Sequence, residues 1–144
     1  MLNKVEKPIA VFILDEDPDN RHLTHLDFEA IEWVSQVRIF SWSLDLLQHL
    51  DGLSGPAFGP ALIIFNNDIQ MMTGKEFLFR LLEHPHCRQT KFGIYDSGLR
   101  EGDELWIQST GITLLKRPVD LEDGRRLALQ IRDTALKETR HSKC

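Results

Sequence analysis

The chain has 144 residues, of which 42% are apolar and 27% are charged. A chain of this length buries roughly 70% of the surface that its unfolded form exposes, so wholesale disorder is excluded and one domain over residues 1–144 is expected. The 17 Lys and Arg residues against 22 Asp and Glu residues leave a net charge of −5, which argues against a nucleic-acid partner bound by a basic face.

Five short apolar runs predict β-strands. They cover residues 9–14, 37–40, 61–65, 92–95 and 112–115. The first and third runs are continuous, which is typical of parallel strands buried on both faces. Gly93 weakens the fourth prediction, because glycine is unfavourable inside a strand.

Amphipathic segments between these runs predict helices. They are expected over about residues 23–34, from Ser43, after the Thr73–Glu76 capping box, over 98–110, and from about Asp120. The last helix is expected to place Leu121, Ala128, Ile131 and Ala135 on one side. Strand–helix alternation of this kind indicates an α/β fold with a parallel sheet covered on both faces.

Polar residues follow most of the predicted strands. Ligands of open α/β sheets bind beyond the carboxyl ends of the strands, so these residues are the candidate site. They are Asp15, Glu16 and Asp17 after the first strand, Asn66, Asn67 and Asp68 after the third, Asp96 and Ser97 after the fourth, and Lys116 and Arg117 after the fifth. Carboxylates gathered at one edge repel each other and favour a divalent cation or a basic partner.

These residues resemble the receiver domains of two-component response regulators, from Ile9 to about Asp133. Asp15 and Glu16 resemble the acidic pair of that family, and Arg117-Pro118 stands in the place of its Lys-Pro pair. Asn66 stands at the phospho-acceptor position, with Gly74 eight residues further on as in the family. The resemblance implies a five-stranded, doubly wound, flavodoxin-like sheet with strand order 2-1-3-4-5. The domain core is then expected over about residues 9–133, with residues 134–144 as the helix end and tail and no segment for an output module.

Several pocket positions depart from the family pattern. Asn66 is an amide, which is a poor nucleophile and removes one charge from a site whose metal prefers carboxylates. Asp96 takes the place of the switch hydroxyl, with Ser97 one residue late, although a one-residue shift of the alignment would place Ser97 there. Arg117 replaces a lysine whose compact ammonium it does not reproduce. We therefore expect Mg²⁺ binding by Asp15 and Glu16 to be weak or lost, and no other cofactor.

Two enzymatic or phosphorylated alternatives stay open. In the first, the chain is an active receiver with a variant pocket, phosphorylated at Asp68 or Asp96. In the second, Asp15 and Asp17 match the Asp-x-Asp pattern of a small Mg²⁺-dependent phosphatase, although a short motif without its structural context is weak evidence. The segment from His84 to Cys87 contains metal-ligand residue types, but its spacing favours a polar loop.

The function expected from the resemblance is that of a pseudo-receiver in phosphorelay signal transduction, which is not an enzyme and acts on protein partners. A histidine kinase or a downstream effector is the expected partner, and a homodimer through the last helix and fifth strand is an alternative. The expected contact residues are Leu105, Trp106, Leu127 and the Arg125–Arg126 pair.

The remaining sequence features concern location. No apolar run approaches the ~20 residues of a membrane span, and the first residues lack the apolar region of a signal peptide. The two cysteines, Cys87 and Cys144, suit a reducing compartment. We therefore expect a cytoplasmic protein with no membrane partner.

Overall fold

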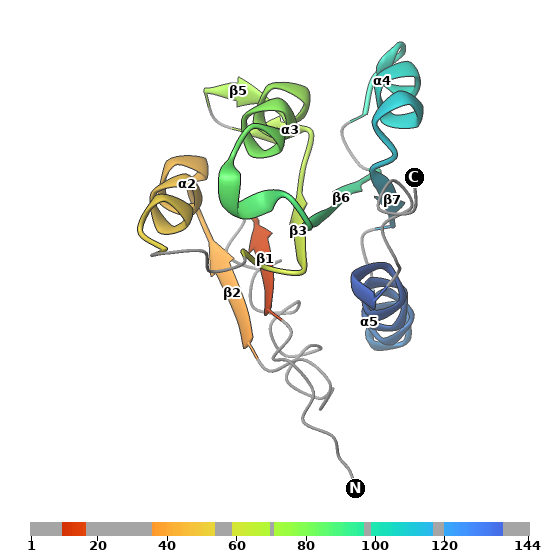
Figure 1. Cartoon of the computed structure of the whole chain (residues 1–144). Coiled ribbons are helices and arrows are strands. Elements are labelled where there is room, and N and C mark those ends of the chain that lie inside the picture. The colour runs from red at the N-terminus through yellow and green to blue at the C-terminus, as the bar shows by residue number, and fades with distance from the viewer. Residues whose placement is uncertain are drawn as a thin grey trace, which may run out of the picture.

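The centre of the molecule is a five-stranded parallel sheet (Figure 1). The computed structural model describes residues 10–16, 36–53, 59–69, 71–96, 99–116 and 120–136. The sheet strands are β1 (Ala10–Leu14), β2 (Gln36–Phe40), β3 (Leu62–Phe65), β6 (Lys91–Tyr95) and β7 (Thr113–Leu115). Their order, β2-β1-β3-β6-β7, confirms the predicted topology, and each strand begins and ends within one residue of its predicted range.

Helices cover both faces of this sheet. They are α2 (Ser43–Asp51), α3 (Gly74–Leu82), α4 (Asp103–Thr110) and α5 (Leu121–Leu136). Figure 1 shows α2, α3 and α4 on one side of the sheet and α5 on the other. The helix expected over residues 23–34 lies outside the described residues. None of the described helices is long and apolar enough to cross a membrane.

The core consists of two apolar layers, one on each face of the sheet. Alternate residues of β1 enter different layers, as the two-residue period of a strand requires. Phe12 packs in the layer under α2, α3 and α4, whereas Ile13 packs with Ile131 of α5. This confirms the prediction that the continuous apolar runs form strands buried on both faces.

Local sequence signals determine two of the helix starts. The Thr73 hydroxyl accepts a hydrogen bond from the Glu76 amide at 3.1 Å, and the Glu76 carboxylate accepts one from the Thr73 amide at 2.8 Å. This confirms the capping box that opens α3. At α5, the Asp120 carboxylate accepts a hydrogen bond from the Asp123 amide at 2.8 Å, as a helix-capping residue does.

Helix α4 is shorter than predicted. The expectation of a helix from residue 98 was wrong, because Gly102 has a φ of +95° and α4 begins only at Asp103. A left-handed residue cannot continue an α-helix, and Gly111, with a φ of +75°, ends the helix in the same way.

A small antiparallel hairpin after β3 was not predicted. It pairs β4 (Asp68–Ile69) with β5 (Met72–Thr73). Met71 lies in its turn with a φ of +75°, a conformation that a methionine rarely adopts. The hairpin carries the chain from the end of β3 to the start of α3, so it lies directly beside the candidate site.

Candidate functional site at the carboxyl end of the sheet

Asp15 and Asn66 come together at the carboxyl end of the sheet. The register pairs Ile13 of β1 with Ile64 of β3, and its continuation by two residues brings Asp15 level with Asn66. Neighbouring strands lie about 4.8 Å apart. Asp15 is fully buried, and its amide donates a hydrogen bond to the Phe40 carbonyl at 2.9 Å. The predicted acidic residue and the predicted acceptor position are therefore neighbours.

The segment that follows β3 is packed tightly against the start of α3. The Gly74 amide donates a hydrogen bond to the Asn67 carbonyl at 2.9 Å. A Cβ atom at Gly74 would lie 3.0 Å from the Asn67 Cα atom and 3.1 Å from the Asn66 carbonyl oxygen. A side chain at this position would thus press on the backbone of the site, which gives a physical reason for glycine there.

The other predicted pocket residues are described only in part. Asp96 follows β6, its side chain is exposed, and its amide donates a hydrogen bond to the Leu115 carbonyl at 2.8 Å. Lys116 follows β7 and is also exposed. Asp68 contributes its backbone to β4, but its side chain lies outside what the structure describes. Asp17, Ser97 and the Arg117-Pro118 pair lie outside the described residues as well.

The described residues at this edge offer few of the ligands that a magnesium centre needs. Mg²⁺ takes oxygen ligands and favours carboxylates. Asp15 is a buried carboxylate and Glu16 is half-buried, but the neighbouring position is the neutral amide of Asn66. Among the described residues, no group of three or more His, Cys, Asp or Glu side chains could hold a metal ion.

A carboxylate that the sequence analysis did not single out is connected to this edge. Asp103, the first residue of α4, accepts a hydrogen bond from the Asn67 side-chain amide at 3.3 Å. It also accepts hydrogen bonds from the Arg100 amide at 2.7 Å and from the Trp106 indole at 3.0 Å. The Arg100 and Trp106 donors stabilise the charged form and lower the pKa of Asp103, the Arg100 amide contributing most. An acidic residue in a first helical turn was the available signal, but Asn67, the partner that connects it to the site, is 36 positions away.

The expected contact surface on α4 and α5 needs correction. Leu105 is 75% exposed, as expected, but Trp106 and Leu127 are only 7% and 5% exposed. Including these two residues in a contact surface was therefore wrong, because both pack into the core. Leu114 of β7 and Leu129 of α5 are exposed in their place.

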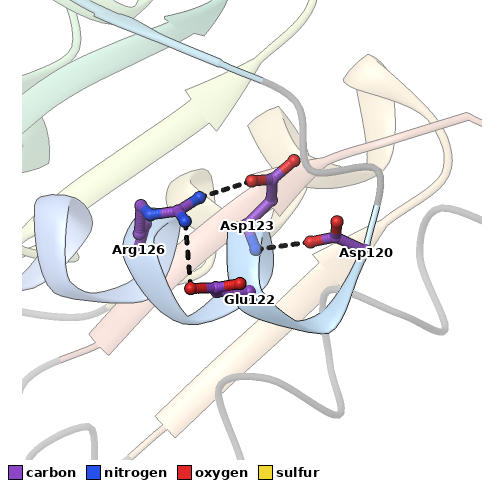
Figure 2. A network of polar contacts seen from close by, with 4 residues as sticks. All are labelled: Asp120, Glu122, Asp123 and Arg126. Atoms are coloured by element: carbon purple, nitrogen blue, oxygen red, sulfur yellow. Dashed lines mark hydrogen bonds and ion pairs between the residues drawn. The ribbon is translucent and has the colours of Figure 1, made fainter.

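The arginine pair of α5 is also different from a free basic patch. Figure 2 shows the Arg126 guanidinium between two carboxylates of its own helix. Its nitrogens lie 2.6 Å from an Asp123 oxygen and 3.2 Å from a Glu122 oxygen. Arg125 is exposed. Because two carboxylates pair with Arg126, it does not form a free basic patch with Arg125.

The segment from His84 to Cys87 forms a turn between α3 and β6. Pro85–Cys87 is a short 3₁₀ helix, and Cys87 is buried. The His84 ring lies 2.7 Å from an Asp51 oxygen through Nε2, and its Nδ1 accepts a hydrogen bond from the His86 amide at 3.2 Å. Both ring nitrogens of His84 thus serve the local structure.

Comparison with solved structures identifies the fold class. The response regulator Rcp1 in its Mn²⁺-bound form superposes with a TM-score of 0.72 at 14% identity, over 92% of this chain and 97% of that chain. The phosphorylated cyanobacterial phytochrome response regulator RcpA gives 0.74 at 13% identity, over 91% and 96%. The chemotaxis response regulator CheY4 of Vibrio cholerae gives 0.68 at 14% identity, over 90% and 100%.

The fold is therefore that of a doubly wound α/β domain with its polar site at the carboxyl end of the sheet. More narrowly, the chain has the receiver fold of response regulators, as its sequence features predicted. No protein-family model matches the chain, and a search of curated proteins finds no significant match.

Proposed function

We propose that this protein is a receiver-like domain of two-component signalling that is not phosphorylated at the usual position and acts by binding other proteins. The observation that carries the proposal is Asn66, an amide at the end of β3 beside the fully buried Asp15. An amide oxygen cannot form the acyl phosphate that a carboxylate forms. In this proposal the domain is not an enzyme and works in the cytoplasm, which its low cysteine content favours.

Electrostatics at the edge of the sheet support this proposal. Replacement of a carboxylate by an amide removes an attraction of about 4 kcal/mol for each unit of charge on a bound cation, at 4 Å and an effective dielectric constant of 20, before desolvation. The exposed carboxylate of Asp96, in the place of the switch hydroxyl, would repel an incoming phosphoryl group. The full burial of Asp15 also disfavours the phosphatase alternative, because a nucleophile must reach its substrate.

Phosphorylation can be tested directly on the full chain. The protein is incubated with acetyl phosphate and Mg²⁺, and separately with a histidine kinase, and its intact mass is measured. The expected result is no gain of mass, while an active receiver treated in parallel gains one phosphoryl group. A phosphoryl group that peptide mapping places on Asp68 or Asp96 would establish the active-receiver alternative and overturn the proposal.

The proposed partner surface is formed by α4, β7 and α5, with Leu105, Leu114 and Leu129 as its exposed apolar residues. The partner would be a histidine kinase or a downstream effector, and a homodimer through the same surface is the alternative. Leu129→Glu is expected to abolish capture of a kinase or effector partner. Leu44→Glu on α2 is the matched control, because Leu44 is equally exposed but lies on another helix.

Sedimentation of the unmodified chain distinguishes the two kinds of partner. A concentration-dependent dimer that Leu129→Glu dissociates would establish the homodimer. Capture that both leucine variants lose equally would show that α4, β7 and α5 do not form the contact surface.

A further inference from the structure

Asp103 joins the site to α4. Its Oδ2 atom accepts hydrogen bonds from the Arg100 amide at 2.7 Å and from the Asn67 side chain at 3.3 Å, and its Oδ1 atom accepts one from the Trp106 indole at 3.0 Å. Asn67 is 9% exposed and directly follows Asn66. One carboxylate thus binds Asn67, which follows the phospho-acceptor position, Arg100 in the turn before α4, and the core residue Trp106 of α4.

Helix α4 has few other local determinants of its position. It has eight residues, and such a short helix is marginal in isolation. The residue before it is Gly102, which has no side chain to cap the first turn. The Asp103 carboxylate instead accepts a hydrogen bond from the Arg100 amide just before the helix, and its negative charge at this end interacts favourably with the helix dipole. Besides the core packing of Trp106 and Ile107, the partners of Asp103 therefore help to set the position of α4.

We propose that the Asn67–Asp103 hydrogen bond couples the segment after β3 to α4 and holds α4 in the orientation that exposes Leu105. The coupling is a property of the fold, and its regulatory consequence rests on the function proposed above. A partner that binds beside Asn66 and withdraws the Asn67 amide weakens the attachment of α4. Binding at the carboxyl edge of the sheet then changes the Leu105 surface without transfer of a phosphoryl group.

Hydrogen exchange measured by mass spectrometry on the full chain tests this coupling. Asn67→Ala removes the donor and is expected to speed amide exchange in α4 about tenfold, because hydrogen bonds to charged groups are among the stronger ones. Asn67→Asp places a second carboxylate against Asp103 and is expected to speed it further. Glu104→Gln is the matched control, since Glu104 lies in the same first turn and is exposed.

The double variant Asn67→Asp with Asp103→Asn keeps the test valid if a single variant is poorly folded. It exchanges the donor and the acceptor, so it is expected to recover part of the α4 protection that Asn67→Asp loses. Urea unfolding of each variant separates a local effect on α4 from a global loss of stability.

Two results would overturn the coupling. One is that the α4 amides of Asn67→Ala exchange at the same rate as those of the wild type. The other is α4 exchange that rises only in parallel with exchange in β1 and β3, together with no recovery in the double variant. The measurement needs neither phosphate nor a partner, so the coupling and the proposed function can fail separately.

Discussion

The substitution Asn66→Asp tests the electrostatics at the carboxyl end of the sheet most directly. It creates a second carboxylate level with Asp15, which is fully buried on the neighbouring strand. With two unit charges about 5 Å apart and an effective dielectric constant of about 20, the repulsion is about 3 kcal/mol. In a domain of this size, each kcal/mol shifts the melting temperature by about 2–4 °C. We therefore expect Asn66→Asp to melt about 10 °C below the wild type in EDTA.

Mg²⁺ should reverse this loss. The variant adds a carboxylate to those of Asp15 and Glu16, which suits Mg²⁺ better than the amide does. A ligand at 100 times its dissociation constant stabilises a protein by about 2.7 kcal/mol. The assay is thermal and urea unfolding in EDTA and in a Mg²⁺ series. Gln89→Glu, which adds a carboxylate at an exposed turn residue, serves as the control.

Two outcomes would refute this reasoning. If Asn66→Asp is as stable as the wild type in EDTA, positions 15 and 66 do not share a low-dielectric site. If Mg²⁺ stabilises the wild type and the variant equally, the amide of Asn66 is not what weakens the cation site.

Three further predictions concern packing and titration. Gly74→Ala should lower the free energy of unfolding by about 1–3 kcal/mol in urea titrations, because its Cβ atom would lie 3.0 Å from backbone; an unchanged midpoint would contradict this. Burial raises the pKa of the Cys87 thiol to about 11, so in a Cys144→Ser background a thiol reagent at pH 8 should label Cys87 slowly unless the protein is unfolded. The pKa of Asp103 lies below its ordinary value of 3.8, because the Arg100 and Trp106 donors favour the charged form. The stability that ionised Asp103 contributes is thus complete above pH 3.8 and is lost as the pH falls through the lower folded-state pKa. The amides of α4 should lose their protection against exchange only in that lower pH range.

The sequence predicted the elements of the sheet because burial leaves a direct trace in composition. Strands covered on both faces must be apolar throughout, so β1 and β3 appear as continuous runs. The capping box of α3 was equally readable, because its two hydrogen bonds join residues only three apart. The strand order followed from the resemblance, through the acidic pair, Asn66 with Gly74, and the Arg117-Pro118 pair.

The hairpin after β3 and the exposure of the α4 side chains could not be predicted from local sequence patterns. The turn of the β4–β5 hairpin contains Met71 with a positive φ, and methionine is not a residue type from which a turn is predicted. Leu105 and Trp106 are adjacent in sequence, but successive helical residues point in different directions, and packing on the sheet decided that Trp106 is buried and Leu105 exposed.

By itself, the sequence determined the strands, the starts of α3 and α5 and the amide at position 66, because each depends on composition or on residues a few positions apart. The tertiary structure alone decided which side chains of α4, β7 and α5 reach the surface, and that Asn67 meets Asp103. These two residues are 36 positions apart, and their hydrogen bond exists only because the parallel sheet brings the end of β3 close to the start of α4.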